Sequence, residues 1–222
     1  WNFPFIVMAE RLPFMLAAGC TVVAKPSEYA SGSCLILGEI LHEAGIPAGV
    51  YNVVTGNGST VGKYLVENNN ISMVSFTGST ENGKSIMKAA SKNLKRVSLE
   101  LGGKSPIIVF SDCDLDKAAD AVINGFTDNA GQCCIATSRL LVDETIYSQF
   151  MERIISKINK IDFQQSLATD DQFNKVRSYI DRAKEISDLD MIGGETDSNR
   201  RFVSPTIIEY HDTDYEIYKE EI

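Results

Sequence analysis

Residues 71–83, ISMVSFTGSTENG, place an apolar run directly before a Gly-Ser turn and the start of an amphipathic segment. Short runs rich in β-branched and aromatic residues favour strands, and Ser or Thr at a turn favours the start of a helix. We therefore expect a strand at 71–76, a helix cap at 77–79 and a helix at 81–90. This order of strand, turn and helix is typical of a sheet covered by helices, which is an α/β fold.

The same alternation continues on both sides of this stretch. The glycine pair Gly102-Gly103 interrupts it, and we place a domain boundary there, between residues 1–102 and 103–222. Hydrophobic periodicity and turn residues predict the other elements. Strands are expected at 21–24, 50–54, 96–99, 107–110, 140–142 and 206–209, and helices at 31–44, 61–67, 114–131, 146–161 and 173–186.

The composition and charge of the chain exclude several classes of partner. Its 222 residues are 44% apolar and 23% charged, as in ordinary globular proteins, and the net charge is -9. Negative charge opposes binding to nucleic acid and to anionic lipid, and no apolar run approaches the roughly 18 residues that span a bilayer. We therefore expect a small-molecule substrate, and neither nucleic acid nor a membrane as a partner.

The five cysteines do not have the spacing of a zinc site. His42 and His211 have no companion ligands, so we expect no bound metal. Reduced thiols are typical of a cytoplasmic protein. The chain begins at Trp1 without a basic segment followed by an apolar one. We therefore expect no signal peptide, and we expect both ends to lie within a longer protein.

Two adjacent cysteines, Cys133 and Cys134, follow Gly131-Gln132 where a helix is expected to give way to a loop. A thiol in such a place is open to a ligand. Because a free thiol has a pKa of about 8.5, a nucleophilic cysteine needs a base or a positive potential nearby. The alternative interpretation of either cysteine is a small buried hydrophobic residue.

Glu100 lies between two leucines and is followed by the glycine pair. Apolar surroundings would raise the pKa of such a carboxylate towards the range of a general base. The alternative is a surface glutamate at the end of a strand.

Three further segments carry polar groups in places where ligands bind. Residues 77–83 join a strand to a helix, so free N–H groups could meet a phosphate, although a helix cap explains the same pattern. Residues 25–28, KPSE, follow a strand end, and an exposed charged loop is the alternative. Asn2, in WNFP, could donate to an oxyanion or could simply hold a turn.

Together and in this order, the motifs resemble those of the aldehyde dehydrogenase superfamily, over the whole chain. The matching segments are WNFP (1–4), KPSE (25–28), FTGST (76–80), LELGGKSP (99–106), GQCC (131–134) and EEI (220–222). Complete members are longer. The resemblance therefore implies a Rossmann-like nucleotide-binding part in residues 1–102 and an α/β catalytic part in residues 103–222, both incomplete.

The resemblance also implies a chemistry, the oxidation of an aldehyde to a carboxylic acid. Cys134 would be the nucleophile, Glu100 the general base that activates water for thioester hydrolysis, and Asn2 a donor to the oxyanion. The intact protein would be a homo-oligomer. Two alternatives stay open, a CoA-acylating semialdehyde dehydrogenase and a truncated, non-catalytic fragment that binds nucleotide. Glu100 argues against the first, because the acylating branch typically lacks a carboxylate there.

The implied cofactor is NAD, with NADP as the alternative. Glu28 favours NAD because a carboxylate bonds ribose hydroxyls and repels a 2′-phosphate, yet one Glu on a loop can swing away. Lys25 and Glu28 would contact the adenosine ribose, Ser79 the pyrophosphate and Glu221 the nicotinamide ribose. Glycines that would let the backbone approach the dinucleotide are Gly58, Gly78 and Gly83.

Overall fold

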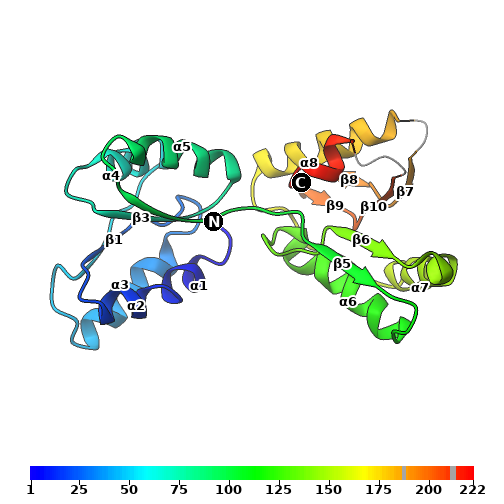
Figure 1. The fold of residues 1–222 in the computed structure, drawn as a ribbon, viewed down its shortest axis with the longest axis horizontal. Coiled ribbons are helices and arrows are strands. Elements are labelled where there is room, and N and C mark those ends of the chain that lie inside the picture. The colour runs from blue at the N-terminus through cyan, green and yellow to red at the C-terminus, as the bar shows by residue number, and fades with distance from the viewer. Residues whose placement is uncertain (187–188, 211–213) are drawn as a thin grey trace. The chain divides into compact units, whose positions relative to one another are not determined.

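The structure is a computed structural model that describes residues 1–186, 189–210 and 214–222. His211, one of the two histidines considered above, lies outside the described residues. The chain divides into two units, Trp1–Leu101 and Gly102–Ile222, and each is described by itself (Figure 1).

The first unit is built from two strand–helix–strand repeats preceded by two short helices. In each repeat a helix connects two parallel strands, as parallel pairing requires. Val22 pairs with Tyr51 in one sheet, and Met73 with Arg96 in the other. The elements are α1 (Pro4–Ala9), α2 (Leu12–Ala17), β1 (Val22–Ala24), α3 (Gly32–Glu43), β2 (Tyr51–Val53), the π-helix η1 (Gly58–Gly62), α4 (Lys63–Glu67), β3 (Met73–Thr77), α5 (Thr80–Ser91) and β4 (Arg96–Glu100).

The second unit contains one parallel and two antiparallel strand pairs. β5 pairs with β6 in parallel, whereas β7–β10 and β8–β9 are antiparallel. The elements are β5 (Pro106–Val109), α6 (Leu115–Thr127), η2 (Asp128–Gly131), β6 (Arg139–Val142), η3 (Glu144–Ile146), α7 (Tyr147–Ile158), α8 (Asp170–Lys184), β7 (Asp190–Ile192), β8 (Thr196–Asp197), β9 (Phe202–Val203), β10 (Ile207–Glu209) and α9 (Glu216–Lys219).

Every strand and helix expected from the sequence is present, with ends that differ by a few residues. The helix predicted over 114–131 is too long at its C-terminal end, because α6 stops at Thr127 and a short 3-10 turn follows. The helices α1 and α2 were not predicted. Each carries a proline in its first turn, where the missing N–H costs nothing, but neither has an amphipathic pattern.

The core of the second unit lies between the β5–β6 pair and the helices α6 and α7. Phe150 and Ile154 on α7 have no exposed surface, and they pack with Val122 of α6 and Val109 of β5. Truncating a side chain such as Phe150 to Ala costs about 3–5 kcal/mol, because both burial and packing are lost. This core therefore fixes α6, the helix that leads into the two adjacent cysteines.

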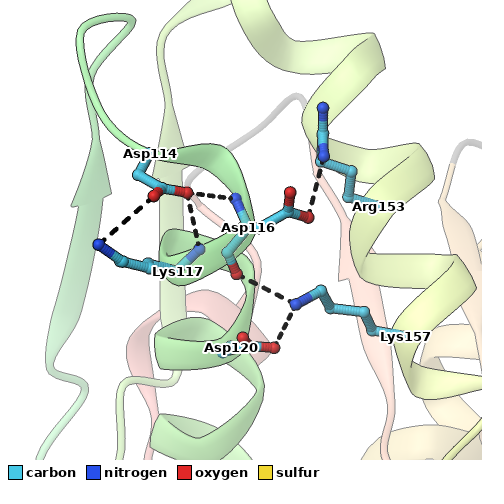
Figure 2. Close-up of polar contacts among 6 residues, drawn as sticks. All are labelled: Asp114, Asp116, Lys117, Asp120, Arg153 and Lys157. Carbon is cyan, nitrogen blue, oxygen red and sulfur yellow. Dashed lines mark hydrogen bonds and ion pairs between the residues drawn. The ribbon is translucent and has the colours of Figure 1, made fainter.

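Charged side chains reinforce the contact between α6 and α7 at the surface (Figure 2). Asp116 on α6 accepts from Arg153 on α7 at 2.9 Å, and Asp120 pairs with Lys157. Asp114 caps α6, since its Oδ1 accepts from the Asp116 N–H at 3.1 Å. Exposed ion pairs contribute only about 0.2–1 kcal/mol each, so the buried core dominates this packing.

In the part of the chain that the structure describes, no helix combines the length and the apolar character needed to cross a membrane.

Candidate active site

The two adjacent cysteines lie in the loop over residues 128–138, which joins α6 to β6 and is called the cysteine loop below. It begins with three consecutive residues in the left-handed region, Asn129, Ala130 and Gly131, with φ of 50°, 58° and 75°. A non-glycine residue in that region costs about 1–3 kcal/mol and persists only where surrounding contacts hold it. The position of the cysteines therefore depends on the contacts of this loop.

The cysteine loop is anchored on both sides of the thiols. After them, the Thr137 N–H donates to the Gly125 carbonyl at 2.9 Å, and a Cβ at position 125 would lie 2.1 Å from Thr137 Oγ1. Before them, Gln132 Nε2 donates to the Asn129 carbonyl, and Gln132 Oε1 accepts from the Ala168 N–H, both at 2.9 Å. The glutamine of the GQCC motif therefore stabilises the loop through both of these hydrogen bonds.

Cys134 is exposed, whereas Cys133 is half-buried. Desolvation raises the pKa of the Cys134 thiol, and the charges of Cys133 and Glu221 raise it further. Within this unit the thiol is therefore favoured over the thiolate. A nucleophilic role needs a proton acceptor or a positive potential from another group.

The glycine pair that follows Glu100 contacts both Cys134 and Glu221. A Cβ at position 102 would lie 1.7 Å from Glu221 Oε2, and a Cβ at 103 would lie 3.2 Å from the Cys134 carbonyl oxygen. A Cβ at 102 would therefore displace the end of the Glu221 side chain, and a Cβ at 103 would require a shift of a few tenths of an ångström. The structure therefore brings together Cys134 and Glu221, two of the residues predicted from the sequence.

Lys104 comes directly after this glycine pair and was not predicted as part of the site. Burial lowers its pKa to about 8, and the Arg139 cation acts in the same direction. The negative charge of Glu221 opposes that lowering. The Lys104 carbonyl accepts from Arg139 Nε at 2.6 Å. A lysine inside a known motif gives no sign in the sequence that it is desolvated.

Glu100 is the last residue of β4, and its side chain is 65% exposed. The prediction that the flanking leucines surround this carboxylate is wrong. Side chains alternate along a strand, so Leu99 of β4 faces the side opposite to Glu100. It forms an ion pair with Arg11, whose Nη2 lies 3.9 Å from Glu100 Oε1. Arg11 Nη1 also donates to Ser75 Oγ at 2.5 Å. Arg11, which sequence reasoning missed, therefore lies between Glu100 and β3.

The main chain joins Glu100 to the turn after β3. Thr77 pairs with Glu100 in the parallel ladder, and the Gly78 N–H donates to the Glu100 carbonyl at 3.1 Å. Ser79 then caps α5, since its Oγ accepts from the Asn82 N–H at 3.3 Å. The predicted cap is confirmed, and the N-terminal N–H groups of α5 follow it, where the helix dipole favours an anion.

The two glycines of this turn and helix have close neighbours within the protein. A Cβ at Gly78 would lie 2.5 Å from the ring of Phe76, and a Cβ at Gly83 would lie 2.6 Å from Leu101 Cδ2. Gly83 therefore lets α5 pack against Leu101. This packing explains a glycine at 83 without any ligand.

The KPSE segment folds into a local network at the end of β1. Lys25 Nζ donates to the carbonyls of Pro26 at 2.7 Å and Gly56 at 2.9 Å, and it lies 3.6 Å from Glu28 Oε2. A hydrogen bond from its own backbone N–H lowers the pKa of Glu28, and Lys25 and the Gly58 backbone contribute to that lowering. Three predicted cofactor residues, Lys25, Glu28 and Gly58, thus lie together.

Asn2 is half-buried and directly precedes Phe3, which has a φ of 45° and begins the turn into α1. Asn2, Glu100 and the predicted cofactor residues from 25 to 83 belong to the first unit, whereas Cys134 and Glu221 belong to the second. Across residues 1–186, 189–210 and 214–222, no group of three or more His, Cys, Asp or Glu side chains could hold a metal ion.

Comparison with known proteins covers the whole chain. The model of the aldehyde dehydrogenase family matches residues 1–222. The chain belongs to the aldehyde dehydrogenase family. It is 42% identical to aldehyde dehydrogenase family 2 member C4 of Arabidopsis thaliana, with all of this chain and 46% of that relative covered. The chain spans about half the length of the curated relatives it matches.

Solved structures of aldehyde dehydrogenases share the fold. An NAD-dependent aldehyde dehydrogenase from Sinorhizobium meliloti is 44% identical, with a TM-score of 0.94 over all of this chain and 46% of that one. Betaine aldehyde dehydrogenase from Staphylococcus aureus, in complex with NAD+, is 36% identical, with a TM-score of 0.93 over all of this chain and 46% of its own. The α/β fold class expected from the sequence is confirmed.

Proposed function

We propose that the intact protein containing this chain oxidises an aldehyde to a carboxylic acid, with NAD as hydride acceptor. Residues 1–102 would be the second half of the nucleotide-binding domain, and residues 103–222 the first half of the catalytic domain. The observation that carries the proposal is the presence, in one chain of this family, of an exposed thiol, Cys134, and an exposed carboxylate, Glu100, each on a family motif.

The residues present fit a dinucleotide. Lys25 and Glu28 form a polar network at a strand end, where a ribose would bond to both. The capped N-terminus of α5, at Ser79, would face the pyrophosphate, and Glu221 would bond the nicotinamide ribose. When bound, the nicotinamide supplies a hydride acceptor.

The chain's own groups would carry the remaining steps. The Cys134 thiolate adds to the aldehyde carbonyl, and the Asn2 amide and the Cys134 N–H stabilise the oxyanion. Loss of hydride leaves a thioester on Cys134. Glu100 then takes a proton from water, which attacks the thioester and releases the acid. NADP use, homo-oligomerisation and a cytoplasmic location stay predictions from the sequence.

The CoA-acylating alternative differs only in the group that takes the acyl chain. It does not need a general base for water, so a carboxylate at the end of β4 favours hydrolysis. The non-catalytic alternative, a fragment that only binds nucleotide, predicts no NADH from any aldehyde even when the gene product is complete.

The test uses Glu100→Gln in the full-length protein, because this change keeps the size of the side chain and removes its ability to take a proton. Turnover should fall by about 10²–10⁴-fold, the usual contribution of a general base. Mass spectrometry after quenching should then find an acyl adduct on the peptide that carries Cys134. The reaction should also be run at alkaline pH, where the thiolate forms unaided.

Two matched variants control this experiment. Cys133→Ala should keep most activity, whereas Cys134→Ser should abolish both turnover and the adduct. Normal turnover by Glu100→Gln, or turnover that requires CoA in the unmodified protein, favours the acylating alternative.

A further inference from the structure

The segment between α7 and α8 contacts the cysteine loop from a distant part of the sequence. Gln165 Oε1 accepts from the backbone N–H of Ala130 at 2.6 Å, across 35 residues of chain. Three residues further on, the Ala168 N–H donates to Gln132 Oε1 at 2.9 Å. The two hydrogen bonds run in opposite directions, since each segment supplies one glutamine side chain and one backbone N–H.

The segment that carries Gln165 is itself fixed. Leu167 is 4% exposed, and its N–H donates to the Arg201 carbonyl at 2.9 Å. The next helix begins at Asp170, capped by Thr169. Gln165 therefore reaches the cysteine loop from an anchored stretch of backbone.

Ala130 is the residue of the loop that most needs such a contact. It lies in the middle of the left-handed run, at φ 58°, and unlike Gly131 it has a Cβ that disfavours this conformation. A main-chain N–H that bonds a fixed side chain resists relaxation of the strained backbone. Four residues later comes Cys134, so relaxation at Ala130 would move the thiol.

We propose that Gln165 is a positioning residue that holds the cysteine loop in the shape that presents Cys134 for reaction. The inference rests on the proposed role of Cys134 as nucleophile. Gln165 touches neither substrate nor thiol in this role, and it acts through the backbone of Ala130. Because reacting atoms must be held in near-attack geometry, a small shift of the loop lowers the rate of acylation more than it lowers the affinity for aldehyde.

The test compares two substitutions at this position in the full-length protein. Gln165→Met keeps the length of the side chain and removes the oxygen acceptor, whereas Gln165→Glu keeps an oxygen that accepts from Ala130. Gln164→Met is the matched control, since Gln164 bonds Asp162 and Arg200 rather than the cysteine loop. Two quantities are measured, amide hydrogen exchange in the peptide over residues 128–134 and the rate of the first NADH burst at saturating NAD.

In Gln165→Met, exchange should rise and the acylation rate should fall, each by about threefold to tenfold, the range of a single hydrogen bond. The KM for aldehyde should change little. In Gln165→Glu and in Gln164→Met, both the exchange over residues 128–134 and the acylation rate should be close to those of the unmodified protein. Normal exchange and a normal rate in Gln165→Glu would show that the defect of Gln165→Met comes from the lost oxygen acceptor and not from the change of side chain as such.

Three results overturn the proposal: unchanged exchange in Gln165→Met, changed exchange with an unchanged burst rate, or a Gln165→Glu variant as defective as Gln165→Met. Absence of any NADH production from aldehydes by the unmodified protein contradicts the proposed function instead. In that case hydrogen exchange still decides whether Gln165 holds the loop.

Discussion

The carboxylate of Glu221 occupies the space that a side chain would need at Gly102. A Cβ at 102 would lie 1.7 Å from Oε2 and 2.1 Å from Cδ of Glu221. The contact involves the far end of a flexible side chain, so a larger residue at 102 would displace Glu221 rather than prevent folding. The absence of a side chain at Gly102 therefore allows the Glu221 carboxylate to occupy this position.

We predict that Gly102→Ala weakens cofactor binding without a comparable loss of stability. If Glu221 bonds the nicotinamide ribose, its displacement should raise the KM for NAD by about tenfold, as expected for one hydrogen bond to a charged group. Steady-state kinetics of the full-length protein give the KM, and thermal unfolding gives the stability. Gly32→Ala is the control, since a Cβ there meets no atom within 4 Å. An unchanged KM for NAD in Gly102→Ala would argue against the assignment of Glu221.

The reactivity of Cys134 should depend on pH with a midpoint above that of an ordinary thiol. Desolvation raises the pKa of Cys134, and nearby negative charge adds to it, so the thiolate forms only as pH rises through this raised value. Glu221→Gln removes one negative charge, which should move the midpoint of alkylation to lower pH. The rate of iodoacetamide labelling of the Cys134 peptide, followed against pH, measures this.

Glu220→Gln is the matched control for that experiment, because Glu220 is not among the groups that shift the pKa of Cys134. A midpoint that moves upward in Glu221→Gln, or that moves equally in both variants, contradicts the prediction.

Gly125→Ala should damage the cysteine loop from its far side. The new Cβ would lie 2.1 Å from Thr137 Oγ1 and 3.3 Å from Thr137 Cβ, so residue 137 must move. A displacement of about 1 Å near reacting groups can cost on the order of 10²-fold in rate. We therefore expect kcat to fall by at least about tenfold, with a smaller effect on KM.

A second substitution tests the cause. Thr137 Oγ1 is buried and has no hydrogen-bond partner within the described residues, so Thr137→Ala alone should be nearly neutral. Combined with Gly125→Ala, it removes the clashing atom and should restore part of the rate. If the double variant is as slow as Gly125→Ala, the contact with Thr137 is not the reason for the loss.

The intact protein should prefer NAD to NADP because of Glu28. Its carboxylate, held in the network with Lys25, would repel a 2′-phosphate. Glu28→Gln should therefore raise kcat/KM for NADP relative to NAD by roughly tenfold, the order expected from one charge repulsion. Parallel kinetics with both cofactors measure the ratio, and Glu43→Gln on α3 is the charge control. A tenfold preference of the unmodified protein for NADP would exclude this role.

Much of the α/β pattern was predictable, because the strands and the amphipathic helices carry strong periodic signals. The turn from β3 to α5 is the clearest case, with Ser79 at the cap where the sequence placed it. The helices α1 and α2 were missed because short, uniformly apolar segments have no period to detect. The motifs identified candidate residues, yet Cys134 and Glu221 are 87 residues apart (221 − 134), and no local pattern predicts their contact with one glycine pair.

The contacts that support the candidate site residues could not be predicted from the sequence either, because they join residues that are far apart in the chain. Arg11 beside Glu100 and Gln165 beside Ala130 are long-range pairs of ordinary polar residues. The expectation of apolar surroundings for Glu100 failed because neighbours along a strand face opposite sides. Burial of a residue depends on the face it occupies, and that face is set by the register of the sheet.

The hydrogen bond from the Gly78 N–H to the Glu100 carbonyl has a consequence for engineering. It links the turn after β3, where the proposed function places the cofactor, to the peptide that carries the Glu100 carboxylate, so remodelling the backbone at 77–79 to suit another dinucleotide would also displace residue 100. Under the proposed function, redesign of cofactor preference at this turn and preservation of acid release by Glu100 are therefore one design problem. Changes restricted to the side chains of the KPSE loop leave that shared peptide contact intact.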